Sequence, residues 1–174
     1  MEMKLHQGIK YYFDKGVLQS VEPAEAHFGF TYWSLLIPPF KPESVLILGS
    51  GMGTVTKLIR KIYGAIPIDE IDKTLGVDAF KYAAKTNKVY DYVIVDLFDG
   101  AEVPKKAHTE KFISDLARIT KTMVAVNDPI KSETSPFWHL YDKEFDLVLL
   151  KRLNNNTVSF YIKEGVTKQF FAIK

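Results

Sequence analysis

The sequence predicts an α/β fold built around a doubly wound, mostly parallel sheet. One reason is that strand-like and helix-like segments alternate along most of the chain, as they do in βαβ folds. Another is an apolar run, residues 45–48, that passes directly into three glycines at alternate positions, Gly49, Gly51 and Gly53. Such a continuous apolar strand is typical of parallel sheets, which are buried on both faces. Apolar side chains then recur at helical spacing over residues 55–62, which predicts a strand, a tight turn and a helix in this order.

Composition limits the classes of function. The chain has 174 residues, of which 47% are hydrophobic and 25% charged, enough for one compact unit with a sizeable core. Its formal net charge is only +2, which argues against nucleic acid or a membrane surface as partner. Cysteine is absent and the four histidines lack metal-ligand spacing, so we expect no disulfide and no metal site. With no apolar stretch of membrane-spanning length and no signal-peptide pattern, we expect a cytoplasmic protein.

The N-terminal part, residues 1–43, differs in character from the Rossmann-like domain that we predict over residues 44–174. Two β-prone runs, residues 9–13 and 17–20, flank a short turn with a glycine, which predicts a β-hairpin. A proline then opens a predicted helix over residues 23–36, which a pair of prolines ends.

The remaining elements follow from hydrophobic period and composition. The predicted strands are residues 65–68, 90–95 and 123–126, and the predicted helices are residues 78–86, 108–119 and 136–141. Two final β-prone segments, residues 145–152 and 158–163, flank three asparagines. They predict an antiparallel hairpin at the edge of the sheet.

Polar side chains follow the predicted parallel strands at the points where these strands end. The strand ends are residues 49–53, 69–72, 96–100 and 127–128. In an open α/β sheet, ligands bind beyond the carboxyl ends of the strands. Because these ends carry several carboxylates around one glycine turn, we expect a polar crevice rich in hydrogen-bond acceptors.

The spacing of the glycines separates two classes of cofactor. A dinucleotide fingerprint needs G-x-G-x-x-G, whereas this chain has Thr54 at the sixth position and gives G-x-G-x-G. The form found here resembles the first motif of S-adenosylmethionine-dependent transferases. Two alternatives stay open: a structural turn without a ligand and, disfavoured by Thr54, a nicotinamide-dependent oxidoreductase.

The chain is too short between its second and third expected strands. Joining parallel neighbours takes a dozen or more residues, yet only residues 71–74 separate Glu70 from the segment 75–78. Either the usual third strand is missing, or residues 74–77 fold back beside the second strand. We therefore predict that the helix between the second and third strands is deleted, and that the sheet is shortened on this side with an exposed edge.

Several motifs together resemble the spermidine synthase family of polyamine aminopropyltransferases, of which this chain would be a shortened and divergent member. They are the hairpin, the aromatic segment after it, and residues 44–54, 69–72, 76–79 and 90–100. The resemblance implies a Rossmann-like sheet of the methyltransferase type behind a small N-terminal β-domain. It also implies S-adenosylmethionine or its decarboxylated form as the cofactor, without a metal.

The resemblance assigns cofactor-binding roles residue by residue. The loop from Gly49 to Gly53 would lie along the amino-acid or aminopropyl portion of the donor. Glu70 would accept hydrogen bonds from both ribose hydroxyls, and Asp78 would face the adenine amino group. Gln19 also matches the family pattern and belongs to the expected cofactor site.

The same resemblance assigns the chemistry to two carboxylates. Asp96 would accept a proton from the attacking amine, and Asp99 would be the second acid of that loop. This role is chemically sound, because an amine is nucleophilic only when it is deprotonated. Three places depart from the family. Met52 stands where the synthases have an acid within the glycine loop, residues 28–30 replace their Tyr-Gln-Glu pattern for the polyamine, and Gly100 stands where they usually have proline.

The expected function is a spermidine synthase-like transferase that moves an aminopropyl or methyl group from the donor to a small amine. The alternative is a non-catalytic relative that keeps the fold as a binding or oligomerisation module. Met52 and the short crossover favour this alternative. The expected partners are a small-molecule amine acceptor, if the chain is active, and further copies of the chain in a homodimer or homotetramer.

Overall fold

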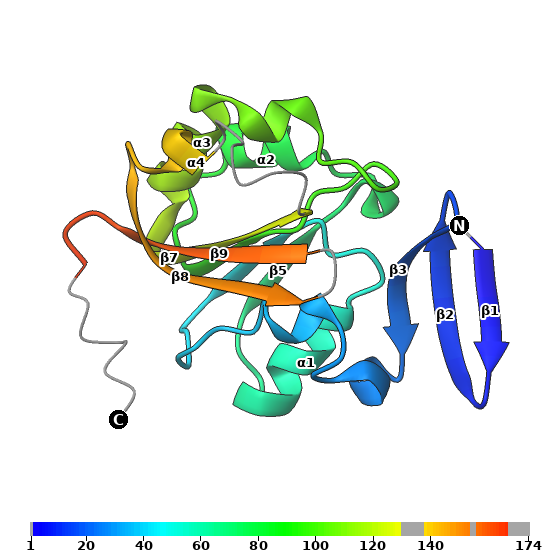
Figure 1. Ribbon diagram of the computed structural model, residues 1–174. Coiled ribbons are helices and arrows are strands. Elements are labelled where there is room, and N and C mark those ends of the chain that lie inside the picture. Colours follow the sequence, from blue (N-terminus) through cyan, green and yellow to red (C-terminus); the bar gives the residue numbers. More distant parts are fainter. Residues whose placement is uncertain (1, 130–137, 154–155, 167–174) are drawn as a thin grey trace.

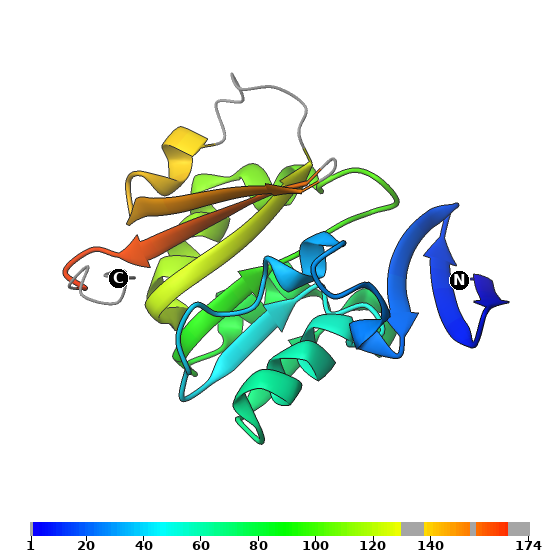
Figure 2. The ribbon, with the colours of Figure 1, turned by 60° about the horizontal axis from the view of Figure 1, so that its bottom comes forward.

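The computed structural model describes residues 2–129, 138–153 and 156–166. It contains a three-stranded sheet near the N-terminus and a six-stranded sheet that carries most of the core. Figures 1 and 2 show the small sheet standing to one side of the large one, next to the end where the glycine loop lies. The α/β fold with a mostly parallel central sheet is thus confirmed.

The small sheet consists of β1 (Glu2–His6), β2 (Ile9–Asp14) and β3 (Val17–Glu22), paired antiparallel in this order. The predicted hairpin is therefore confirmed, with Lys15 at positive φ in its turn. The strand β1 is an addition that the sequence analysis did not predict. Its side chains are all exposed, so no buried face marks it in the sequence.

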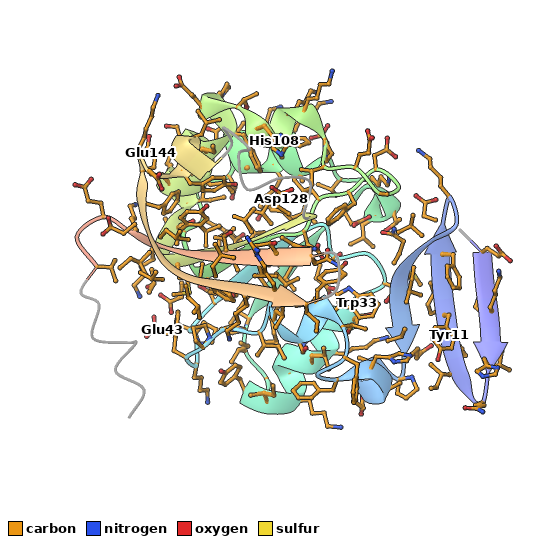
Figure 3. All side chains as sticks on the ribbon, in the orientation of Figure 1. Tyr11, Trp33, Glu43, His108, Asp128 and Glu144 are labelled. Carbon is orange, nitrogen blue, oxygen red and sulfur yellow. The ribbon has the colours of Figure 1, made fainter. Side chains whose placement is uncertain are left out.

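The predicted helix over residues 23–36 is wrong. Two short 3₁₀ turns, η1 (Ala24–His27) and η2 (Tyr32–Ser34), take its place. Gly29 lies between them with φ +82°, a left-handed conformation that interrupts any α-helix. The large apolar side chains of this stretch still reach the core, where Trp33 and Leu36 are buried. Trp33, labelled in Figure 3, packs at the junction of the two sheets.

The large sheet has the strand order β5-β4-β6-β7-β9-β8. Its first four strands in this order are parallel, and β9 and β8 form an antiparallel extension at the far edge. The strands are β4 (Val45–Leu48), β5 (Ile68–Ile71), β6 (Tyr90–Val95), β7 (Thr120–Pro129), β8 (Phe145–Leu153) and β9 (Asn156–Lys163). The predicted strands at 45–48, 90–95 and 123–126 and the C-terminal hairpin are confirmed, while residues 154–155 of its turn lie outside the described residues.

Helices cover both faces of this sheet (Figure 1). They are α1 (Thr54–Tyr63), α2 (Ala79–Lys85), α3 (Glu110–Ile119) and α4 (Trp138–Tyr141), with a 3₁₀ turn η4 (Lys105–His108) before α3. One apolar layer joins α2, α3 and Tyr141 to the sheet, and a second joins α1 and the η2 region to the opposite face. The predicted helices at 78–86 and 108–119 are confirmed. The helix predicted over 136–141 is present as α4 over its described residues, and residues 136–137 lie outside the described part.

The shortened side of the sheet is confirmed, and β5 is its edge strand. This strand lies at Ile68–Ile71 rather than at residues 65–68, because its polar residues Asp69 and Glu70 pair with the buried strand β4. After it, η3 (Lys73–Leu75) leads directly into α2 and then into β6. Residues 74–77 form no strand, so the usual third strand is the element that is missing.

Candidate functional site

A cleft of about 680 Å³ opens at the carboxyl ends of β4, β5 and β6. Its walls come from the glycine loop, the segment from Asp72 to Phe80, the loop after β6, and the side chains of Tyr32 and Trp33. The position agrees with the general rule for ligand sites in open α/β sheets. The η3 turn and the residues after it supply the wall on the shortened side of the sheet, where a third strand would otherwise stand.

Gly49 is required by the packing of two neighbouring strand ends. A Cβ on this residue would lie 2.1 Å from the backbone oxygen of Asp96, and its φ of +93° disfavours any other residue. Gly51 is also at positive φ, and its N–H donates a 2.9 Å hydrogen bond to Oδ2 of Asp72. The glycine loop is therefore held against the ends of both β5 and β6.

Thr54, which breaks the dinucleotide fingerprint, has a structural role. Its hydroxyl is buried and hydrogen-bonds the hydroxyl of Ser20, and the N–H of Val21 donates to it at 3.2 Å. A glycine here would lose these contacts. Thr54 thereby attaches β3 of the small sheet to the start of α1, next to the glycine loop.

Asp96 lies in the cleft at the end of β6 and is only 8% exposed. Nδ2 of Asn127 donates a 2.8 Å hydrogen bond to its Oδ1, and the Tyr32 hydroxyl donates to the same carboxylate. Burial raises the pKa of Asp96 from 3.8 to about 7, the two hydrogen bonds oppose this rise, and the charge of Asp72 adds to it. Asp96 is thus a buried carboxyl that titrates near neutral pH.

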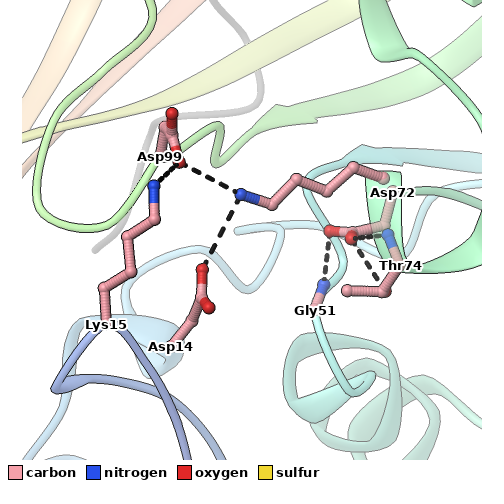
Figure 4. Close-up of polar contacts among 7 residues, drawn as sticks. Asp14, Lys15, Gly51, Asp72, Thr74 and Asp99 are labelled. Carbon is pink, nitrogen blue, oxygen red and sulfur yellow. Dashed lines mark hydrogen bonds and ion pairs between the residues drawn. The ribbon is translucent and has the colours of Figure 1, made fainter. Parts of the chain in front are cut away.

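Asp99 reaches the same cleft in a very different setting (Figure 4). Its carboxylate is 63% exposed and pairs with Nζ of Lys15 at 2.7 Å and Nζ of Lys73 at 3.4 Å. Lys73 also lies 3.8 Å from Asp14 in the hairpin turn. The hydrogen bond and charge of Lys15, with Lys73 assisting, lower the pKa of Asp99. It is therefore ionised at neutral pH and already paired with cations.

Two further aspartates line the wall next to the shortened edge. Asp72 is 9% exposed and accepts hydrogen bonds from the N–H of Gly51 and from the N–H of Thr74, both drawn in Figure 4. Asp78 lines the cleft as the N-cap of α2, where its Oδ1 accepts from the N–H of Lys81 at 2.9 Å. Both side chains are fixed by backbone donors and hold negative charge at the cleft wall.

The structure does not place Glu70 and Gly53 on the cleft lining. Oε1 of Glu70 accepts a 2.7 Å hydrogen bond from Oγ1 of Thr56, on the first turn of α1. A Cβ on Gly53 would lie 3.2 Å from this same oxygen, so the two predicted residues meet each other beneath the loop. Gln19, Gly49, Gly51, Asp78, Asp96 and Asp99 all line the cleft.

Sequence reasoning missed several residues of the site. Tyr32 and Trp33 line the cleft, but nothing in their local sequence marks a ligand contact. Asp72 and Asn127 lie at strand ends that the sequence did single out, but only the fold shows that they touch the glycine loop and Asp96. Ser50, between two of the glycines, lines the cleft with a buried hydroxyl that has no hydrogen-bond partner among the described residues.

The lining suits a cationic ligand with polar groups. Its charged residues are five aspartates and one lysine, namely Asp14, Asp72, Asp78, Asp96, Asp99 and Lys73. Such a surplus of carboxylates attracts positive charge, and the free hydroxyl of Ser50 offers a donor and acceptor to a polar group. A sulfonium nucleoside carries both features, so the residues present fit an S-adenosyl cofactor. Within the described residues, no cluster of His, Cys, Asp and Glu has the arrangement of a metal site.

Comparison with known proteins gives a consistent fold. No protein-family model matches the chain. A probable spermidine synthase from Corynebacterium glutamicum superposes with a TM-score of 0.76 at 16% identity, covering 92% of this chain and 76% of that one. Human Methyltransferase-like protein 13, solved with SAH, superposes with a TM-score of 0.61 at 16% identity, covering 84% of this chain and 83% of that one.

One curated relative is similar in sequence. It is a polyamine aminopropyltransferase of Vibrio vulnificus, which is 26% identical over 138 residues. The match covers 66% of this chain and 44% of the relative, so the chain spans less than half of that protein's length.

The fold is a Rossmann-like sheet of the methyltransferase type, with the cleft at the carboxyl ends of its parallel strands. The chain is similar in sequence to a polyamine aminopropyltransferase and in fold to a probable spermidine synthase, which agrees with the resemblance of its motifs. The part of the chain that the structure describes has no helix long and apolar enough to cross a membrane.

Proposed function

We propose that this protein is an S-adenosyl-dependent transferase that moves an aminopropyl or methyl group to a small amine, with Asp96 as the base. The observation that carries the proposal is the place and state of this carboxyl. It lies in the cleft beside the glycine loop, buried and hydrogen-bonded by Asn127 and Tyr32, with a pKa of about 7.

A pKa near neutrality makes Asp96 a better base than an ordinary carboxylate. An alkylammonium ion has a pKa of about 10, some six units above that of an exposed aspartate, and this gap opposes proton transfer. Burial of Asp96 closes about half of the gap while the carboxylate is still ionised in much of the protein at neutral pH. Asn127 and Tyr32 fix the orientation of the carboxylate, so that it both binds the attacking amine and takes its proton.

The donor supplies a carbon bound to a positively charged sulfur, which is a good leaving group. What the chain adds is placement, and alignment of two reactants is itself a large part of such catalysis. The aspartates of the lining attract the sulfonium, Asp78 would face the adenine amino group, and the glycine loop lets the donor approach the backbone. For Glu70 to hold the ribose hydroxyls, its side chain would have to leave Thr56.

The alternative function is a non-catalytic relative that uses the fold for binding. Two observations favour it: Met52 offers no charge to the amine of a donor and is 41% exposed, and Glu70 is engaged by Thr56. The acidic lining and the raised pKa of Asp96 favour the transferase. Burying a carboxyl without a cationic partner costs free energy, and groups with such shifted pKa values are concentrated at functional sites.

Calorimetric titration of the whole chain tests the cofactor assignment. The ligands are S-adenosylmethionine, its decarboxylated form and methylthioadenosine, each also titrated into Asp78→Ala and Glu70→Ala. Asp146→Ala, an exposed aspartate on β8 far from the cleft, is the control for the loss of one carboxylate. We expect binding that Asp78→Ala weakens and Asp146→Ala leaves unchanged. Failure of all three ligands to bind at millimolar concentration would exclude the transferase.

Binding by the two alternative donors separates the reactions. The decarboxylated donor carries an additional net positive charge, since it has lost its carboxylate, and the acidic cleft should favour it on charge alone. Preference for this donor supports aminopropyl transfer, whereas preference for S-adenosylmethionine supports methyl transfer.

A further inference from the structure

A second cavity of about 340 Å³ adjoins the cleft. The two share four lining residues, which are Gln19, Tyr32, Trp33 and Phe98. Tyr32 also hydrogen-bonds Asp96, so a molecule in this second cavity lies one side chain away from the proposed base. Its location suits the acceptor of a group whose donor occupies the cleft.

The chemistry of the second cavity is unlike that of the cleft. None of the described residues that line it is charged. Tyr32, Trp33 and Phe98 provide aromatic surface, and Val17 and Leu18 provide aliphatic surface. Its remaining side chains with polar groups are uncharged, namely Gln19, Thr31 and Asn156. Such walls can pack against an apolar or aromatic part of a ligand and hydrogen-bond to a few of its neutral polar groups.

Two charged residues of the described chain next to this cavity, Lys15 and Asp99, do not supply a free negative partner. Gly100 forms part of its wall, and a Cβ on Gly100 would lie 3.5 Å from Cδ of Lys15. The lysine thus passes beside the cavity. Asp99, the carboxylate next to Gly100, is already paired with Lys15 and Lys73.

These walls discriminate between two kinds of amine. A diamine has two ammonium groups at neutral pH, and Asp96 can pair only with the group that reacts. The second would be buried without a carboxylate, which costs several kcal/mol. A monoamine with an uncharged body has no such cost, and its body gains contact with the aromatic walls.

Resting on the proposed transferase function, we infer that the second cavity is the acceptor site and that it selects a monoamine with an aromatic or apolar body over a diamine. The nitrogen lone pair of the acceptor attacks the donor carbon on sulfur, the carbon–sulfur bond breaks, and a neutral thioether leaves. The proton of the attacking nitrogen goes to Asp96.

The affinities of three probe amines test the inference. Calorimetry first measures the binding of methylthioadenosine, a stand-in for the donor. Phenethylamine, butylamine and diaminobutane are then titrated into the protein saturated with that nucleoside. We expect phenethylamine to bind at least about tenfold more tightly than diaminobutane, because of the unpaired ammonium, with butylamine between them.

The variant Asn156→Asp supplies the missing charge with almost no change of shape. It should raise the affinity for diaminobutane by about tenfold or more, since a carboxylate then faces the second ammonium, and it should not improve the binding of phenethylamine. Asn156→Ser is the control for the loss of the amide, and it should leave the preference for the monoamine unchanged.

The outcomes separate the two proposals. If methylthioadenosine binds but diaminobutane binds as tightly as phenethylamine, or neither amine binds, the acceptor inference is overturned while the cofactor site stands. If the nucleoside itself does not bind, the proposed transferase function fails, and the inference fails with it.

Discussion

The side-chain amide of Asn127 donates a 2.8 Å hydrogen bond to the carboxylate of Asp96 across two neighbouring parallel strands. The register explains the contact: Val95 of β6 pairs with Val126 of β7, so the next residue of each strand leaves the same edge of the sheet side by side. The other amide atom, Oδ1 of Asn127, is buried without a hydrogen-bond partner among the described residues.

Removing either hydrogen bond to Asp96 should move the pH dependence of the reaction. The bonds from Asn127 and Tyr32 both favour the ionised carboxylate and lower its pKa. In Asn127→Leu and in Tyr32→Phe we therefore expect the pKa of Asp96 to lie above the wild-type value of about 7. The acidic limb of kcat/KM should shift to higher pH in both variants. An unchanged limb together with a reduced maximal rate would mean that these residues have only a structural role.

Asp96→Asn should abolish transfer and yet stabilise the fold at alkaline pH. Because burial raises the pKa of Asp96 from 3.8 to about 7, the folded state keeps a proton that the unfolded state has lost between these two values. The wild type therefore loses stability as the pH rises through this window. The advantage of asparagine should be absent near pH 4 and reach at most about 4 kcal/mol above pH 7. Denaturant unfolding of both proteins at several pH values measures it; a pH-independent difference would contradict the assigned pKa.

Gly49→Ala should be far more destabilising than Gly76→Ala. Both glycines have positive φ, which costs an alanine about 1–2 kcal/mol. A Cβ on Gly76 meets no atom within 4 Å, whereas one on Gly49 would lie 2.1 Å from the backbone oxygen of Asp96. We expect Gly49→Ala to cost more than about 3 kcal/mol or to prevent folding. Thermal unfolding compares the two; equal shifts in Tm would show that the strand ends can separate without loss.

The lysines around Asp99 should set its pKa but contribute little to stability. In Lys15→Met with Lys73→Met, the carboxylate loses both cations, so its pKa should rise toward 3.8. NMR titration of the Asp99 carboxyl in the wild type and the double variant measures this shift. The Tm should change only slightly, and high salt should remove the difference, because these pairs are exposed. A large loss of stability that persists in salt would contradict this view.

The sequence predicted the large sheet because its signals there are local. Residues 45–48 are a continuous apolar run, residues 90–95 are apolar except for Asp91, and both segments are strands that are buried along their whole length. The short crossover after Glu70 also predicted correctly that the sheet is shortened on this side, since chain length limits topology. It left open whether the third strand is missing or folds back. Residues 23–36 misled the analysis, because their aromatic side chains suggest a buried helix while Gly29 breaks it.

The site was harder to predict than the fold, because it joins residues that are distant in sequence. Strand ends directed attention to Asp96, which lies in the cleft, but its contact with Tyr32 depends on where the N-terminal segment packs. Glu70 lies within β5 and Asp72 directly after its end, and only the structure shows that Asp72 is the one on the cleft wall, because Glu70 is hydrogen-bonded to Thr56 of α1.

A direct assay of transfer tests the central claim, that the cleft holds a donor and Asp96 deprotonates the acceptor. The protein is incubated with S-adenosylmethionine or its decarboxylated form and a mixture of small amines, and the products are analysed by mass spectrometry. We expect an amine heavier by one methylene or one aminopropyl group, formed by the wild type and the Asp146→Ala control but not by Asp96→Asn. A donor that binds tightly while no amine is ever modified would contradict the account and establish the non-catalytic alternative.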